Sequence, residues 1–146
     1  MVKRKAKTAV RELESFCQKS GNRITAPREY VLEIIASSDK PMTAYDVLHE
    51  LANKLDRPKP PTAYRALEFL MQYGFIHRIE SLNAYVACTE DHKHHSSQYL
   101  ICETCKEVDE IHLCKMPDSL KAKVTKKRFS VNHWNAEIHG VCSKCS

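Results

Sequence analysis

The stretch KPPTAYRALEFLMQYG, residues 59–74, decides the fold of the first half of the chain. Pro60 and Pro61 can occupy the first turn of a helix but not its interior, so they predict where a helix begins. Gly74 predicts where it ends. The apolar residues recur at helical spacing and form one stripe: Ala63, Ala66, Leu67, Leu70 and Met71. The opposite face is polar and is free to meet a partner: Tyr64, Arg65, Glu68 and Gln72.

Three further helical patterns precede this stretch, and a hairpin follows it. Apolar spacing predicts helices from Val10 to Gly21, over TAPREYVLEIIA (25–36), and after Pro41, where Thr43 and Asp46 form a capping-box pair. FIHRIE (75–80) and AYVAC (84–88) alternate as two short strands joined by a turn at 81–83. Helices followed by a hairpin predict a winged helix-turn-helix.

The second half has a different order of elements. QYLIC (98–102) and VDEIHL (108–113) are predicted strands, PDSLKAKVTKKRF (117–129) an amphipathic helix, and SVNHWNAEIHGVC (130–142) another strand. The fold class is therefore α+β: a winged-helix DNA-binding domain at 1–88 with a basic N-terminal arm, a polar hinge at 89–97, and a small α/β dimerisation domain at 98–146. Exposed sheet edges and small size favour a homodimer.

Composition limits the class of protein and the partners. The 146 residues are 42% hydrophobic and 28% charged, which is typical of a soluble globular chain. No apolar run approaches the roughly 18–20 residues that span a bilayer, and the N-terminus lacks a signal-peptide pattern, so we expect a cytoplasmic protein without a membrane partner. Residues 1–80 hold 14 Lys or Arg against 10 Asp or Glu, a net charge of +4, which suits a polyanion.

The cysteines predict a structural metal site. Seven cysteines, an odd number, argue against a fully paired disulfide scaffold. Cys102-x-x-Cys105 and Cys142-x-x-Cys145 each present two thiolates, and four thiolates form a closed tetrahedral zinc site. The alternatives are a dithiol redox site or buried cysteines without a ligand. Cys17 lies on an apolar helical stripe and is predicted to pack in the core.

A second, mixed-ligand site can be built from residues that the first leaves over. His77 and Cys88 lie on opposite arms of the predicted hairpin, His95 lies in the hinge, and Glu110 lies on a strand of the second domain. Two nitrogen, one sulfur and one oxygen ligand would suit zinc. Taken singly, His77 also fits a half-buried strand residue and Glu110 a solvated carboxylate.

Several of these motifs together resemble one protein family. PPTAYRALEFL, TAPRE, AYDVL and the paired C-x-x-C motifs are similar to the ferric uptake regulator family of metal-responsive bacterial transcription factors, from about residue 10 to Cys145. AYVAC and the histidine seven residues before Cys102 resemble its zinc uptake regulator branch. The resemblance implies two zinc ions per chain, one structural at Cys102, Cys105, Cys142 and Cys145, and one regulatory at His77, Cys88, His95 and Glu110.

The chain also departs from the iron-sensing members of that family. Ser96, Ser97, Gln98 and Tyr99 stand where those members carry an HxH-type run, and Pro117 falls near an expected glutamate, which leaves His133 without its partners. A thiolate ligand also favours zinc over Fe²⁺ or Mn²⁺. We therefore expect a zinc-dependent repressor of zinc-uptake genes, with zinc as corepressor and no other small-molecule substrate.

The helix at 60–73 is the predicted recognition helix, and its partner is a palindromic, AT-rich DNA operator. Tyr64 and Arg65 are placed to contact bases, and Thr62, Lys59 and Arg28 to contact the backbone. An ordinary solvated helix face is the alternative for Tyr64 and Arg65. Competing functions are an iron- or manganese-responsive regulator of the same family, a zinc enzyme, and a zinc-stabilised interaction module without a DNA role.

Overall fold

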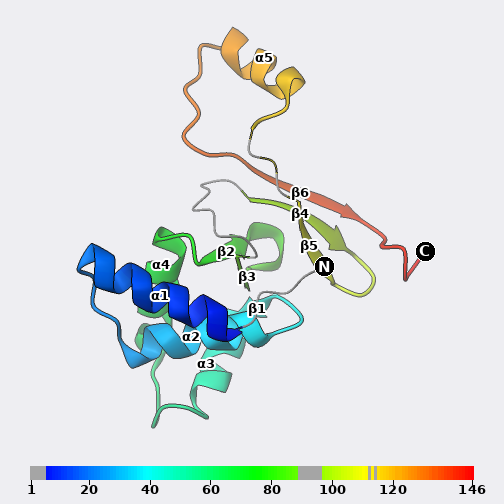
Figure 1. Cartoon of the computed structure of the whole chain (residues 1–146). Coiled ribbons are helices and arrows are strands. Elements are labelled where there is room, and N and C mark those ends of the chain that lie inside the picture. The colour runs from blue at the N-terminus through cyan, green and yellow to red at the C-terminus, as the bar shows by residue number, and fades with distance from the viewer. Residues whose placement is uncertain (1–5, 89–96, 112, 114) are drawn as a thin grey trace. The chain divides into compact units, whose positions relative to one another are not determined.

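The chain contains two compact units, Met1–Lys93 and His94–Ser146 (Figure 1). The computed structural model describes residues 6–88, 97–111, 113 and 115–146. Within the described residues, no helix combines the length and the apolar character needed to cross a membrane. The predicted hinge, 89–97, falls outside the described residues except for Ser97, where the first strand of the second unit begins.

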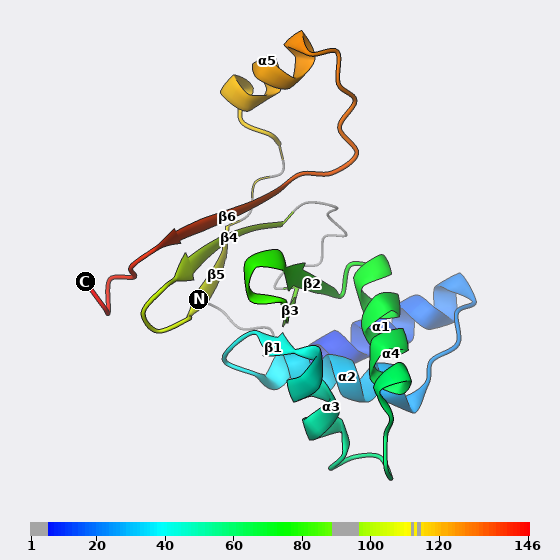
Figure 2. The ribbon, with the colours of Figure 1, turned by 180° about the vertical axis from the view of Figure 1, so that it is seen from behind.

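The first unit consists of four helices and a small antiparallel sheet (Figures 1 and 2). The helices are α1 (Ala6–Ser20), α2 (Ala26–Ser37), α3 (Ala44–Leu51) and α4 (Pro60–Gln72). The strands are β1 (Met42–Thr43), β2 (Ile76–Ile79) and β3 (Ala84–Ala87), in the order β1-β3-β2. The winged helix-turn-helix predicted from the sequence is confirmed. Strand β1 was not predicted, because two residues are too few to show an alternating pattern.

Local sequence signals explain the helix ends. The Thr43 side chain accepts the Asp46 backbone N–H, and an Asp46 carboxylate oxygen accepts the Thr43 backbone N–H, both at 3.1 Å, as in the predicted capping box. Helix α4 begins with Pro60 at its first turn and gives way at Gly74, whose φ of 77° suits glycine. Leu55 lies beyond the end of α3 but still packs against the core.

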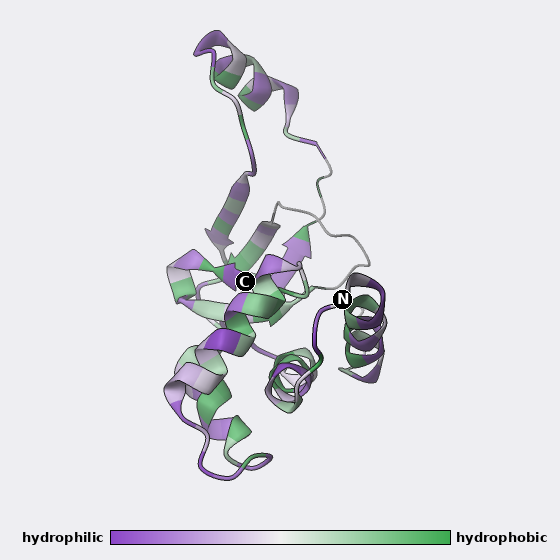
Figure 3. Cartoon of the chain, turned by 90° about the vertical axis from the view of Figure 1, so that its left-hand side faces the viewer, coloured by the Kyte–Doolittle hydropathy of each residue, from purple (hydrophilic) through white to green (hydrophobic). Residues whose placement is uncertain are grey.

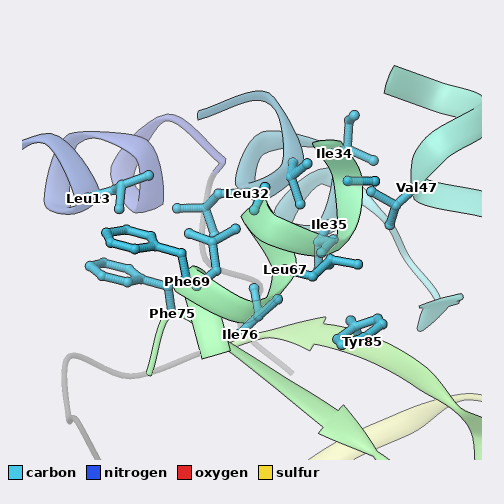
Figure 4. Close-up of a cluster of buried hydrophobic side chains, with 14 of the residues drawn as sticks. Leu13, Leu32, Ile34, Ile35, Val47, Leu67, Phe69, Phe75, Ile76 and Tyr85 are labelled. Carbon is cyan, nitrogen blue, oxygen red and sulfur yellow. The ribbon is translucent and has the colours of Figure 1, made fainter. Parts of the chain in front are cut away.

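A single hydrophobic core holds the first unit together (Figure 4). Side chains with no exposed surface come from every helix: Leu13, Val31, Leu32, Val47, Leu51, Leu67 and Leu70. Phe75, Ile76 and Tyr85 add the sheet side of the same core. Cys17 is buried among these residues, as its position on the apolar stripe of α1 predicted.

The second unit is a three-stranded sheet and one helix. Strand β4 (Ser97–Cys102) lies between β5 (Val108–Ile111), which is antiparallel to it, and β6 (Asn135–Gly140), which is parallel to it. Helix α5 (Asp118–Lys126) lies in the crossover between β5 and β6. The predicted order of strand, strand, helix and strand is confirmed, although β6 is shorter than the strand predicted at 130–142.

The second unit buries little of its apolar surface. In the part of this unit that the structure describes, the buried hydrophobic residues are Tyr99, Ile101, Cys102 and Val108, and α5 contributes none. Large apolar side chains remain exposed on every part of the unit: Leu100, Leu113, Leu120, Phe129, Val131, Ile138 and Val141. Figure 3 shows hydrophobic and hydrophilic residues interleaved along α5. A unit of this composition needs stabilisation from outside its own core.

Candidate metal centre and DNA-binding surface

The fold brings the two C-x-x-C motifs together. Cys102 ends β4 and Cys105 lies in the turn that follows, while Cys142 and Cys145 lie just beyond the end of β6. Because β4 and β6 are parallel neighbours, their carboxyl ends meet at one edge of the sheet, where Cys102 pairs with Gly140. The ligand atoms of all four cysteines lie within 4.8 Å of one another.

The spacing of the sulfur atoms fits a zinc ion. The Sγ atoms of Cys105 and Cys142 are 3.8 Å apart, and all four cysteines are free thiols. Sulfur atoms at about 2.3 Å from one ion in a tetrahedron lie about 3.8 Å from each other. A disulfide would need an S–S distance near 2.05 Å, so the sulfur atoms are not placed as an oxidised pair, and their spacing is one that a zinc ion could occupy.

Hydrogen bonds to sulfur prepare one thiol to ionise. The backbone N–H groups of Cys105 and Cys142 donate to the Cys102 Sγ at 3.5 and 3.4 Å. These bonds, first from Cys105 and then from Cys142, lower the pKa of the Cys102 thiol to about 6. A side-chain hydrogen bond to Cys142, together with desolvation, raises the pKa of Cys145 to about 12. Four adjacent thiols cannot all ionise without a cation, so the cluster is matched to a divalent ion.

Further contacts hold the two motifs against each other. The Lys144 ammonium donates to both carboxylate oxygens of Glu107 at 3.2 Å, which joins the loop after β6 to the loop after β4. The Glu103 backbone N–H donates to the Gly140 carbonyl oxygen at 2.8 Å. The hydrogen bond to Glu107 raises the pKa of Lys144, which keeps this contact charged at neutral pH.

The predicted regulatory residues are distributed over both units. In the first unit, His77 on β2 and Cys88 just after β3 place their ligand atoms within 4.8 Å of each other. Cys88 is buried and His77 is half-buried, so the thiol and the imidazole are partly shielded from solvent. Glu110 lies on β5 of the second unit, opposite Tyr99 of β4. His95 lies outside the described residues.

The exposed face of α4 carries the predicted base contacts. Tyr64 is 51% exposed and Arg65 is also exposed, while their neighbours Ala63 and Ala66 are buried. Lys59, at the N-cap of α4, is exposed, and its carbonyl oxygen accepts the Thr62 backbone N–H at 3.0 Å. These side chains surround the N-terminal end of the helix that helix-turn-helix proteins present to the major groove.

Arg28 has intramolecular contacts that the sequence did not predict. Its guanidinium carbon lies 3.6 Å from the centre of the Phe69 ring, and its Nη1 donates to the Arg23 carbonyl oxygen. A cation held over an aromatic face loses part of its freedom to reach a phosphate. Its role in DNA binding stays a prediction, and a structural role in packing α2 against α4 is already visible.

Sequence reasoning missed Tyr45. This residue lies in the first turn of α3 and is 78% exposed, more than any other large apolar side chain of the described chain. The signal was present in AYDVL, where tyrosine stands on the polar side of a helix whose buried residues are Val47 and Leu51. An aromatic ring left in water beside a recognition helix is a further candidate contact.

The comparisons with known proteins agree with this geometry. A winged helix-turn-helix joined to a unit with a four-cysteine cluster defines a metal-binding regulator of the winged-helix class. A sequence model of the ferric uptake regulator family matches residues 19–146. The chain is 37% identical over 144 residues to the zinc uptake regulation protein of Escherichia coli strain K12, covering 95% of this chain and 84% of that protein. The chain belongs to the ferric uptake regulator family.

Solved structures extend the similarity to three dimensions. The chain is 34% identical to a zinc uptake regulator complexed with zinc and DNA, with a TM-score of 0.88 over 97% of this chain and 95% of that one. It is 37% identical to holo XcZur, with a TM-score of 0.81 over 94% of this chain and 96% of that one. The resemblance inferred from the sequence is confirmed.

Proposed function

We propose that this chain is a zinc-responsive transcriptional repressor of zinc-uptake genes. The observation that carries the proposal is the pair formed by the His77 imidazole and the Cys88 thiol on the β2–β3 hairpin, which is the wing of the fold. Their ligand atoms lie within 4.8 Å of each other, and the hairpin directly follows the recognition helix α4. Support comes from the similarity over 97% of the chain to a zinc uptake regulator complexed with zinc and DNA. As a regulator of genes, it works in the bacterial cytoplasm.

One zinc ion per chain is structural. Zinc supplies a divalent charge that lets four thiols remain ionised side by side. Cys102, Cys105, Cys142 and Cys145 would hold it, and they join the turn after β4 to the tail after β6. Because the second unit buries few apolar residues, this cross-link contributes much of its folding free energy.

A second zinc ion per chain is regulatory. His77 and Cys88 are its ligands from the first unit, with His95 and Glu110 as the ligands from the second. A histidine, a cysteine, a histidine and a glutamate together bring two negative charges, which balance the ion.

Residues of α4 and its N-cap bind the operator. Arg65 is suited to a bidentate contact with guanine O6 and N7, and Tyr64 to a thymine methyl or a phosphate. Lys59 and Thr62 contact the backbone and set the register. Arg28 and the exposed Tyr45 are secondary candidates. A twofold-symmetric dimer then reads the two halves of an AT-rich palindrome about 34 Å apart.

The second unit forms the homodimer. Exposed apolar residues on β4 and β6, including Leu100 and Ile138, surround a cavity of about 440 Å³ that Glu107 and Asp109 also line. The same unit carries Leu120 and several lysines on α5, where no residue is buried. A second copy would cover both apolar surfaces.

Zinc titration into the dimer tests this function. The protein is prepared with its four-cysteine site loaded, and the affinity for an AT-rich palindrome is measured as zinc is added. We expect about 5–150-fold tighter binding, the usual range of allosteric coupling. Cys88→Ser should abolish the increase while the dimer stays folded, and Cys17→Ser is a matched control at a buried cysteine outside the site. Unchanged affinity in the unmodified protein would contradict the proposal.

Two other functions are less well supported. An iron or manganese sensor would favour nitrogen and oxygen ligands, whereas Cys88 offers a buried thiolate. A zinc enzyme needs an open coordination position, and both proposed sites have four protein ligands. Operator binding measured with each ion added alone separates these sensors, since zinc should raise the affinity of the dimer for its operator and Fe²⁺ or Mn²⁺ should not.

A further inference from the structure

Phe75 lies between the recognition helix and the metal ligands of the first unit. It is two residues beyond Tyr73, the C-cap of α4, and two residues before His77 on β2. Its side chain is 9% exposed, and its backbone N–H and carbonyl groups each form a hydrogen bond to a different element. One bond goes to α4 and the other to Cys88, just after β3, so the backbone of Phe75 links these two segments.

The N–H group of Phe75 closes the end of α4. It donates to the Leu70 carbonyl oxygen at 2.9 Å, and the Gly74 N–H donates to the Met71 carbonyl oxygen at 3.1 Å. Together these bonds form a Schellman motif, with Gly74 in the left-handed conformation at φ 77°. The position of Phe75 therefore fixes the last turn of the recognition helix.

The carbonyl group of Phe75 holds the backbone of Cys88. It accepts the Cys88 N–H at 3.0 Å, one step beyond the β2–β3 pair Ile76 and Ala87. Both first-unit ligands of the proposed regulatory zinc are thus tied to this residue, Cys88 by a hydrogen bond and His77 by two residues of chain.

The ring of Phe75 extends the connection to α1. It meets Phe16 edge-on at 5.5 Å between ring centres, and Tyr73 packs on both Phe16 and Phe69 at 4.8 Å. Figure 4 shows Phe69 and Phe75 both extending toward the helix that carries Leu13. Closely packed rings transmit a displacement rather than absorb it, because the interior contains few voids.

We propose that Phe75 is a positioning residue that transmits zinc binding at His77 and Cys88 to the recognition helix within the first unit. The inference rests on the proposed function, since it assumes that zinc bound there raises operator affinity. The proposed route lies entirely inside the DNA-binding unit. Ligand movement at the wing changes the Schellman end of α4 and the aromatic cluster beneath it.

Substitution of the ring tests the route. Phe75→Leu keeps both backbone hydrogen bonds and an apolar side chain but removes the ring contact with Phe16. We expect the zinc-induced increase in operator affinity to fall about 3- to 10-fold, with little change in the affinity of the zinc-free protein. Val47→Ala, a fully buried change on α3 outside this route, is the control, and the two variants are compared by their urea midpoints. The control should keep the full zinc response.

Amide hydrogen exchange gives a readout that does not depend on DNA. In the full-length, DNA-free protein, added zinc should slow exchange of the Phe75 and Cys88 amides, which donate the two linking bonds. The Leu55 amide, which bonds to the Leu51 carbonyl at 2.9 Å beyond the end of α3, serves as a control that should not respond.

Distinct results would overturn the inference and the function. If the unmodified protein responds to zinc and Phe75→Leu keeps the full response, the route through Phe75 is wrong and the proposed function stands. An equal loss in Val47→Ala, or equal slowing at Leu55 and Phe75, would likewise overturn the route. If the operator affinity of the unmodified protein does not respond to zinc, the proposed function is wrong, and the route through Phe75 that rests on it is wrong as well.

Discussion

The two units of this chain are stabilised in different ways. The first packs fully buried leucine and valine side chains from four helices around one core, and side chains cap the starts of α2 and α3 while Gly74 follows the end of α4. Among its described residues, the second buries four hydrophobic side chains and leaves α5 without any. The difference predicts that the first unit is stable by its own packing, whereas the second depends on a metal ion and on a second copy of the chain.

The largest expected effect is loss of the four-cysteine site. Cys102→Ser removes the thiol with the lowered pKa and two backbone N–H partners, so we expect the second unit to unfold and the dimer to dissociate. The first unit should keep its helices. Circular dichroism and sedimentation measure the two outcomes, and Cys17→Ser is the control. A stable dimer with one zinc ion fewer per chain would contradict this dependence on metal.

Truncation of one leucine in each unit sharpens the contrast. Leu67→Ala in α4 removes a side chain with no exposed surface and should lower the free energy of unfolding by about 2–5 kcal/mol. Leu120→Ala in α5, where the side chain is 41% exposed, should cost the monomer less than about 0.5 kcal/mol but weaken dimerisation. Urea unfolding and the dissociation constant of the dimer separate the two effects. Equal losses in monomer stability would show that the units do not differ.

Two kinds of DNA contact are predicted at the recognition helix, one to a base and one to a phosphate. Arg65→Ala should weaken operator binding by about 1–3 kcal/mol and relax the sequence preference at one base pair. Lys59→Ala should weaken binding to all sequences alike. It should also reduce the slope of log affinity against log salt concentration by about one, the value for a single phosphate contact. Binding to operator and scrambled duplexes at several salt concentrations measures both. If Arg65→Ala weakens both duplexes equally, Arg65 does not read a base.

The smallest expected effect lies at the helix caps of the first unit. Thr43→Ala removes a reciprocal capping box with two hydrogen bonds of 3.1 Å and should cost about 1 kcal/mol. Thr25→Ala removes a single bond of 3.4 Å at the start of α2 and should cost less. Thermal unfolding ranks the two variants, and the reverse order would argue against the capping box as the stronger feature.

Local signals explain why most of the fold was predictable. Pro60, Gly74 and the Thr43–Asp46 pair mark helix ends through backbone constraints that act over a few residues, and the C-x-x-C spacing marks a metal knuckle. The parallel pairing of β4 with β6 was not predicted, because it joins segments more than thirty residues apart and leaves no periodic signal. Strand β1 was too short to be recognised.

The candidate site was predictable to a similar degree. Residue type and spacing identified the two cysteine pairs and the His77–Cys88 pair, and the structure brings each set together within its own unit. The contact of Arg28 with Phe69 could not be predicted, because it depends on how α2 packs against α4. Tyr45 was missed because a single polar-side aromatic gives no repeating pattern.

Native mass spectrometry of the protein with its operator, during a chelator titration, tests the central claim most directly. It counts zinc ions, protomers and DNA in the same species, so the roles of the two sites can be separated. Our account predicts that loss of the first zinc ion per chain releases DNA and leaves the dimer intact, and that loss of the second dissociates the dimer. DNA that stays bound after the first loss, or a dimer that dissociates together with the DNA, would contradict it.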